Sequence, residues 1–153
     1  MEQDIPYVLM LEDDSDDRYI TQQFFNDQGY NIGLQFVVDA AEVMPKLEDC
    51  IANGKSLPRL MILDKNVPPK NSMEVVQEIK SDPRFQLIPI VMVSGLAYPG
   101  EIEEAYRCGV SSFITKPVSH ELTARKIDTC IRYWFEVVDL PQQDISTTHQ
   151  HTA

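Results

Sequence analysis

The sequence predicts an open, doubly wound α/β fold in which a strand and a helix alternate five times. Two observations lead to this prediction. Short apolar runs, which suit strands buried on both faces of a parallel sheet, recur along the chain. Between these runs, apolar residues repeat at the helical spacing of i, i+4, and some of these segments stop at a glycine.

Five apolar runs are the expected strands. The runs are Tyr7 to Leu11, Leu34 to Val38, Leu60 to Leu63, Ile88 to Val93 and Phe113 to Thr115. Ligands of open α/β sheets bind in the crevice beyond the carboxyl ends of the strands. Functional residues are therefore expected directly after each run.

Five helices are expected after these runs. Their markers, in chain order, are Ile20 and Phe24, then Val43, Leu47 and Ile51, then residues 73–80, then residues 100–108, and finally Leu122, Ile127 and Ile131. Gly29 and Gly54 stop the first two helices. The second helix has a capping box from Asp39 to Glu42, and Pro45 beyond its first turn is expected to kink the helix or delay its start.

The composition of the chain fits one intracellular domain. Its 153 residues suffice for a single core, and no apolar run is long enough to cross a membrane. The acidic N-terminus lacks the basic start of a secretory signal, so a cytoplasmic location is expected. A net charge of −11 opposes direct binding of nucleic acid. Residues 1–140 are expected to form the domain, and the polar residues 141–153 a flexible tail.

Cysteine and histidine are not arranged as in a metal or redox site. Cys50, Cys108 and Cys130 are far apart in the sequence and lack ligand spacing, so they are expected to be reduced packing residues. Two of the three histidines lie in the polar tail, and His120 is the third. No histidine is expected to take part in a rigid metal or catalytic site.

Polar residues follow four of the expected strands. Glu12 and Asp13 come after the first, Asp64 after the third, Ser94 after the fourth and Lys116 after the fifth. Because these strand ends meet at one edge of a parallel sheet, we expect the side chains to converge. Carboxylates that gather there repel one another and need a cation. Mg²⁺, which prefers oxygen ligands, fits this need and would leave one carboxylate to act as a nucleophile.

The residues at the strand ends form a recognisable set of motifs. The motifs are Leu11-Glu12-Asp13-Asp14, Leu63-Asp64-x-Asn66-x-Pro68, Val93-Ser94-Gly95 and Thr115-Lys116-Pro117. In this order the chain resembles, over about residues 5–138, the receiver domains of two-component response regulators. The resemblance implies a flavodoxin-like fold with strand order 2-1-3-4-5. It also implies a signalling protein, not an enzyme, which receives a phosphoryl group from a sensor histidine kinase or a phosphotransfer protein.

The resemblance implies a role for each matching residue. Asp64 is the expected phosphoacceptor. Asp13, Glu12, Asp64 and the backbone carbonyl of Asn66 are the expected Mg²⁺ ligands, Glu12 acting directly or through a water. Ser94 and Lys116 are expected to bind the phosphoryl group, and the cis or trans state of Pro117 stays open.

Other residues near the motifs have competing interpretations. Phe113, three residues before Lys116, resembles the switch aromatic of receivers and is expected to act as a switch together with Ser94, with a plain core residue as the alternative. Asp14, Asp16 and Asp17 are expected to cap and charge the first turn of a helix, where carboxylates complement the helix dipole, and not to bind metal.

Two positions depart from the usual receiver pattern. Ser72 stands where these domains usually carry glycine, and a positive φ there would cost about 1 kcal/mol unless Asn71 adopts it instead. Ser94 replaces the more usual threonine, so it keeps the hydroxyl group but loses a methyl group that restricts χ1.

Three other functions compete with that of a phosphoacceptor. A flavodoxin-like electron carrier needs a phosphate loop after the first strand, where the acidic EDDSDD would repel the phosphate. An aspartyl-phosphate hydrolase would need an acid at position 66, where Asn66 stands. The main alternative is a degenerate receiver that binds proteins without phosphorylation.

The last expected helix carries consecutive aromatic residues from Tyr133 to Phe135. Because three consecutive helical residues sweep ~200°, they cannot all face the sheet, and at least one should point outward. An outward aromatic residue predicts a homodimer through this helix, or a cover formed by the tail. The Arg132-Tyr133-Trp134-Phe135 segment also resembles stand-alone receivers that partner bacterial phytochromes. Output through a protein contact of this domain is expected.

Overall fold

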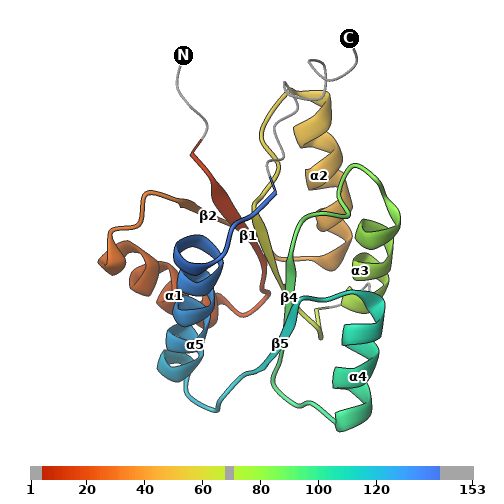
Figure 1. The fold of residues 1–153 in the computed structure, drawn as a ribbon. Helices are drawn as coiled ribbons and strands as arrows, with labels where there is room; N and C mark the ends of the chain where they lie inside the picture. The colour runs from red at the N-terminus through yellow and green to blue at the C-terminus, as the bar shows by residue number, and fades with distance from the viewer. Residues whose placement is uncertain (1–4, 68–70, 142–153) are drawn as a thin grey trace.

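The computed structural model describes residues 5–67 and 71–141, in which five strands alternate with five α-helices (Figure 1). The strands are β1 (Tyr7–Leu11), β2 (Gly33–Val37), β3 (Leu60–Asp64), β4 (Ile90–Ser94) and β5 (Ser112–Thr115). The helices are α1 (Ser15–Gln28), α2 (Val43–Ala52), α3 (Ser72–Ser81), α4 (Pro99–Cys108) and α5 (His120–Arg132). A 3-10 turn, η1 (Ala40–Glu42), precedes α2, and a π-helical turn, η2 (Tyr133–Val137), follows α5. The predicted alternation is confirmed.

The strands form one parallel sheet in the order β2-β1-β3-β4-β5, as predicted. β1 and β3 are neighbours in the middle of the sheet, and Leu11 pairs with Leu63. Asp64, the next residue of β3, pairs with Val93 of β4. This register brings the first residue after β1 and the last residue of β3 to the same edge of the sheet.

Helices cover both faces of the sheet. α1 and α5 lie together on one side, and α2, α3 and α4 lie on the other (Figure 1). Successive strand residues point to opposite faces, so Val8 and Met10 pack on the α1–α5 side while Leu9 and Leu11 pack on the other. β1, β3 and β4 are buried along their whole length, whereas the edge strands β2 and β5 are only partly buried. Burial on both faces therefore holds for the three central strands alone.

The ends of α1 and α2 follow from their sequences. The Asp14 side chain accepts hydrogen bonds from the first-turn N–H groups of α1, and Gly29 ends the helix with φ 65°. Asp39 caps η1, but its side chain bonds the N–H of Ala41, so only part of the predicted capping box forms. Pro45 is the third residue of α2. A backbone N–H at this position would have no partner within the helix, so proline, which lacks one, is tolerated there. Because η1 precedes α2, the regular helix starts late, which is the second of the two effects expected of Pro45, a kink or a delayed start.

Ser72 and Asn71, the two positions where backbone strain was predicted, show none. Among the residues that the structure describes, only glycines have positive φ. Asn71 has φ −71° and caps α3, and Ser72 is the first residue of that helix. The Ser72 hydroxyl donates to the backbone carbonyl of Asp64, so serine adds a tie between α3 and β3. Residues 68–70, including Pro68 of the motif, lie outside the described residues.

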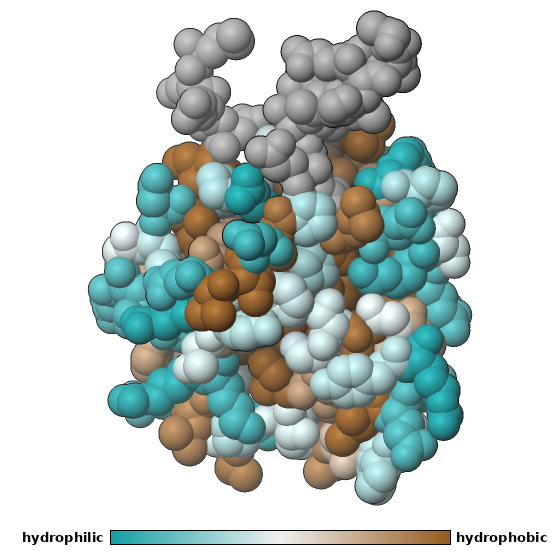
Figure 2. Space-filling model, viewed as in Figure 1, coloured by the Kyte–Doolittle hydropathy of each residue, from teal (hydrophilic) through white to brown (hydrophobic). Residues whose placement is uncertain are grey.

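The end of α5 differs in part from the expected apolar stripe. Ile127 and Ile131 are buried, but Leu122 is 52% exposed, so its place in the buried stripe was wrong. Trp134 packs partly against the core on the α1–α5 side, and Tyr133 is half exposed. Leu122, Tyr133 and Trp134 help to line an open groove of about 900 Å³ between α5 and β5. Figure 2 shows hydrophobic residues that reach the surface among hydrophilic ones on this face.

Three further predictions concern the chain as a whole. None of the described helices is both long and apolar enough to cross a lipid bilayer. All three cysteines are free, as predicted, with Cys50 buried and Cys108 and Cys130 partly buried. The predicted tail lies outside the described residues apart from Pro141, so the boundary at residue 140 stays a prediction.

Candidate functional site

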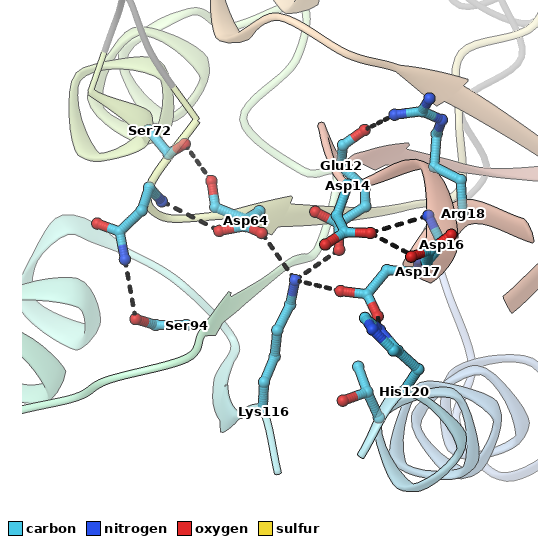
Figure 3. Close-up of polar contacts among 12 residues, drawn as sticks. Glu12, Asp14, Asp16, Asp17, Arg18, Asp64, Ser72, Ser94, Lys116 and His120 are labelled. Carbon is cyan, nitrogen blue, oxygen red and sulfur yellow. Dashed lines mark hydrogen bonds and ion pairs between the residues drawn. The ribbon is translucent and has the colours of Figure 1, made fainter. Parts of the chain in front are cut away.

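The carboxyl edge of the sheet gathers most of the polar residues singled out in the sequence (Figure 3). Glu12 follows β1 and is fully buried, and Asp64 ends β3 and is 9% exposed. Lys116 follows β5, and its side chain reaches across the edge to both acids. The backbone N–H of Lys116 donates to the carbonyl of Ser94, which fixes the start of this loop beside β4. The predicted convergence of these residues is confirmed.

The ammonium group of Lys116 is the centre of the site. Its three N–H groups donate to Oε1 of Glu12, to Oδ2 of Asp64 at 2.8 Å and to Oδ2 of Asp17 at 3.1 Å. Burial alone would lower the pKa of Lys116, but the hydrogen bonds to Asp64 and Glu12 outweigh it and raise the pKa. The lysine is therefore a firmly charged cation among three carboxyl groups.

Glu12 has one unsatisfied oxygen. Burial and the neighbouring Asp64 raise the pKa of Glu12 to about 8, although Lys116 acts in the opposite direction. Oε1 accepts from Lys116, whereas the buried Oε2 has no hydrogen-bond partner in the described part of the chain. Three carboxylate oxygens, one each from Glu12, Asp13 and Asp64, lie within 4.8 Å of one another. An orphaned buried oxygen among clustered carboxylates is the environment that a divalent cation with oxygen ligands fits.

Asp64 is held on both carboxylate oxygens. Oδ1 accepts the backbone N–H of Asn66 at 3.0 Å, and Oδ2 accepts from Lys116. The Ser72 hydroxyl donates to the backbone carbonyl of Asp64, so this carbonyl is also held in place. These contacts fix the direction in which Asp64 presents its side chain at the end of β3.

Ser94 and Asn66 form the wall next to Asp64. The buried Ser94 hydroxyl donates to the carbonyl of Leu96 at 2.7 Å and accepts from the Asn66 side-chain amide at 3.4 Å. Phe113, on the neighbouring strand β5, is partly buried against the core on the α2–α4 side and also lines the groove beside α5. This position fits both interpretations of Phe113, and its role as a switch stays a prediction.

Two residues near the site were misjudged from sequence. Asp17 was expected only to charge a helix end, yet it is 6% exposed and binds Lys116 through one oxygen. Its other oxygen, Oδ1, bonds Nδ1 of His120, the histidine that was expected to have no role near a site. Burial would raise the pKa of Asp17, but the bonds to His120 and Lys116 lower it, and Asp17 in turn raises the pKa of His120.

The buried face of α1 places Asp17 beside the site. Asp17, Thr21 and Phe25 follow one another at i, i+4 and are the buried residues of α1. The apolar pair that marks this helix in the sequence, Ile20 and Phe24, is only partly buried and extends by one turn to Asp16, so the apolar spacing points one residue away from Asp17. His120 gives no signal either, because its contact depends on how α1 and α5 pack, over a sequence separation of 103 residues.

Comparisons with known proteins agree with the motifs. The family model described as the response regulator receiver domain matches residues 8–128. The probable methanogenesis regulatory protein FilR2 of Methanothrix harundinacea is 27% identical over 135 residues, which cover 88% of this chain and 87% of the relative. Two solved structures cover 90% of this chain and 99% of their own: the Mn²⁺-bound response regulator Rcp1, with 25% identity and a TM-score of 0.81, and the phosphorylated cyanobacterial phytochrome response regulator RcpA, with 29% identity and a TM-score of 0.82.

Proposed function

Because the chain belongs to the response regulator receiver family, we propose that it is a phosphoacceptor of a two-component phosphorelay and receives the phosphoryl group on Asp64. The observation that carries this proposal is the Asp64 carboxylate, fixed between Lys116 and the backbone of Asn66 at the strand-end crevice. The phosphodonor is the phosphohistidine of a sensor histidine kinase or of a phosphotransfer protein. The similarity to RcpA, a cyanobacterial phytochrome response regulator, favours the phytochrome-partner subgroup.

The proposed reaction is the transfer of one phosphoryl group. An oxygen of Asp64 forms a bond to phosphorus while the bond from phosphorus to the donor's imidazole nitrogen breaks, and that nitrogen then takes up a proton. Lys116, already within 2.8 Å of Oδ2, is placed to pair with a phosphoryl oxygen. The Ser94 hydroxyl would have to leave the carbonyl of Leu96 before it could donate to another phosphoryl oxygen. The product signals through protein contacts in the cytoplasm, without binding nucleic acid or membrane.

Mg²⁺ is the proposed cofactor. The carboxylates of Glu12, Asp13 and Asp64 would hold it together with the backbone carbonyl of Asn66, and the orphaned Oε2 of Glu12 supports this assignment. When bound, the ion would neutralise negative charge on the phosphoryl group and on the carboxylates around it. In the metal-free protein, Lys116 supplies part of this charge balance.

The proposal is tested by incubating the protein with a small phosphodonor and Mg²⁺ and measuring the intact mass. We expect the addition of one phosphoryl group, and omission of Mg²⁺ or of the donor should prevent it. A mass that stays unchanged under conditions that label another receiver would favour the alternative of a phosphorylation-independent binding module.

Asp13→Ala is expected to weaken Mg²⁺ binding by at least about tenfold, because it removes a carboxylate ligand. Isothermal calorimetry measures the affinity directly. The metal-free variant should melt no lower than wild type, since the change also relieves repulsion among the clustered carboxylates. Asp16→Ala removes an exposed acid from the neighbouring turn and serves as the control. Equal Mg²⁺ affinity in wild type and Asp13→Ala would remove Asp13 from the ligand set.

A homodimer through the last helix is the second part of the proposal. Tyr133 is half exposed at the end of α5, beside the groove that Leu122 and Trp134 line. Tyr133→Glu should convert a dimer at micromolar concentration into a folded monomer, because a charge in an apolar contact must be desolvated. Sedimentation velocity distinguishes the two states, and Tyr19→Glu, at an exposed tyrosine of α1, is the matched control. A wild-type protein that sediments as a monomer with and without a phosphoryl mimic would contradict this part.

A further inference from the structure

The three carboxylates bound by Lys116 differ in what else they do. Asp64 is the proposed phosphoacceptor and Glu12 a proposed metal ligand, so both of their contacts with Lys116 must change when the site is used. Asp17 has neither role, and its Oδ2 lies 3.1 Å from the lysine nitrogen. Of the three carboxylates, Asp17 is the one that can keep its contact with Lys116 while Glu12 and Asp64 change their contacts.

Asp17 is itself held in place. It is 6% exposed, on the buried stripe of α1, so its side chain has little freedom to turn into solvent. Nδ1 of His120, the first residue of α5, bonds the oxygen that faces away from Lys116. The two oxygens of the carboxylate are therefore fixed by two side chains, Lys116 from the loop after β5 and His120 from the start of α5 (Figure 3).

The charges of the pair support this arrangement. His120 lies in the first turn of α5, where the helix dipole disfavours a protonated histidine. The carboxylates of Asp17, Asp14 and Asp16 nevertheless raise its pKa, with Asp17 contributing most. In turn, burial acts to raise the pKa of Asp17, but the bonds to His120 and Lys116 outweigh it and lower the pKa, which favours the charged carboxylate that faces Lys116.

We infer that Asp17, oriented by His120, is a positioning residue. It keeps the ammonium group of Lys116 directed at the phosphoryl group that is transferred to Asp64. The inference rests on the proposed function of the site. Neither residue touches the reacting atoms, and both act through Lys116. Without Asp17, the ammonium group would bind only Glu12 and Asp64 and would be drawn toward the oxygens that the metal and the phosphoryl group must occupy.

The test compares variants of the full-length protein. Asp17→Asn should slow phosphorylation by phosphoramidate about tenfold, the effect of losing one hydrogen bond between charged groups. Asp16→Asn removes the same charge from the same turn of α1 but has no contact with Lys116, and it should match wild type. Mg²⁺ affinity should fall in Asp17→Asn, because the ammonium group then competes more strongly for the oxygens of Glu12 and Asp64, and it should stay unchanged in Asp16→Asn. The rates are therefore compared at saturating Mg²⁺.

His120 variants separate positioning from general stability. In His120→Asn the side-chain amide can replace Nδ1 as the donor to Asp17, so the rate should stay within about twofold of wild type. His120→Leu removes the donor and should lower the rate by severalfold. Equal rates for these two variants, or for Asp17→Asn and Asp16→Asn, would overturn the inference.

A measurement without metal or phosphodonor separates failure of the inference from failure of the proposed function. In NMR spectra of the metal-free protein, the ¹⁵Nζ resonance of Lys116 should shift in Asp17→Asn and stay in place in Asp16→Asn. The pKa of His120 should fall in Asp17→Asn. If wild type takes up no phosphoryl group, the proposed function fails, and an unchanged Lys116 resonance in Asp17→Asn would overturn the positioning role independently.

Discussion

Asp64→Asn should take up no phosphoryl group from a small phosphodonor in the presence of Mg²⁺, whereas wild type takes up one. The amide lacks the negatively charged oxygen that attacks phosphorus, and no other carboxylate is held by both Lys116 and the N–H of Asn66 among the described residues. Intact-protein mass spectrometry gives the result directly. The loss should be complete, because the variant removes the acceptor atom itself.

The control for this variant must remove an acid without changing the site. Asp16→Asn does so, since Asp16 is exposed and its contact with Asp14 runs through the backbone N–H. The wild-type adduct should be lost in mild alkali, because a phosphoaspartate is an acyl phosphate. Full labelling of Asp64→Asn, or an adduct stable to alkali, would show that the phosphoryl group is on another residue.

Lys116→Met should lower the free energy of unfolding of the metal-free protein at pH 7 by about 2–3 kcal/mol. The lysine side chain is 13% exposed and is the cation shared by Glu12, Asp17 and Asp64, so methionine leaves these groups without it. The expected cost lies below that of breaking a fully buried ion pair, because solvent reaches part of the group. Urea unfolding measures it, and Lys55→Met, at an exposed lysine after α2, is the control.

Two conditions should restore part of the stability of Lys116→Met. Mg²⁺ binds the folded state and supplies the missing positive charge, so it should stabilise the variant more than wild type. Lower pH should also narrow the gap, because carboxyl groups that lose the lysine have higher pKa values and take up protons more readily in the folded state. If the variant unfolds at the same urea concentration as wild type, Lys116 does not stabilise the metal-free site.

The fold could be predicted from sequence where apolar residues alone decide the structure. β1 was predicted to the residue, because all five of its residues are buried. The start of β4 was placed two residues early, since Ile88 is also buried but precedes the strand. Partial burial of β2 and β5 follows from their position at the sheet edges, which a single run of residues does not reveal.

The site could be predicted where it depends on strand ends. The carboxyl ends of parallel strands lie together whatever the helices do, so the meeting of Glu12, Asp64 and Lys116 follows from the order of elements. The roles of Asp17 and His120 depend on helix packing. An acid in the first turn of a helix normally stabilises the dipole from the surface, and only the contact between α1 and α5 makes Asp17 a buried partner of the lysine.

The alternation of side chains along β3 links the integrity of the core to the aim of the phosphoacceptor. Leu60 and Ile62 pack on the α1–α5 side while Met61 and Leu63 pack on the other, and Asp64 follows Leu63 in the same strand. Inserting or deleting one residue within β3 would either move the apolar residues before the change to the wrong faces or turn Asp64 to the opposite face. In evolution, insertions and deletions should therefore accumulate in the loops of this chain, where they disturb neither the packing of the core nor the direction of Asp64. The number of residues in β3 should stay constant.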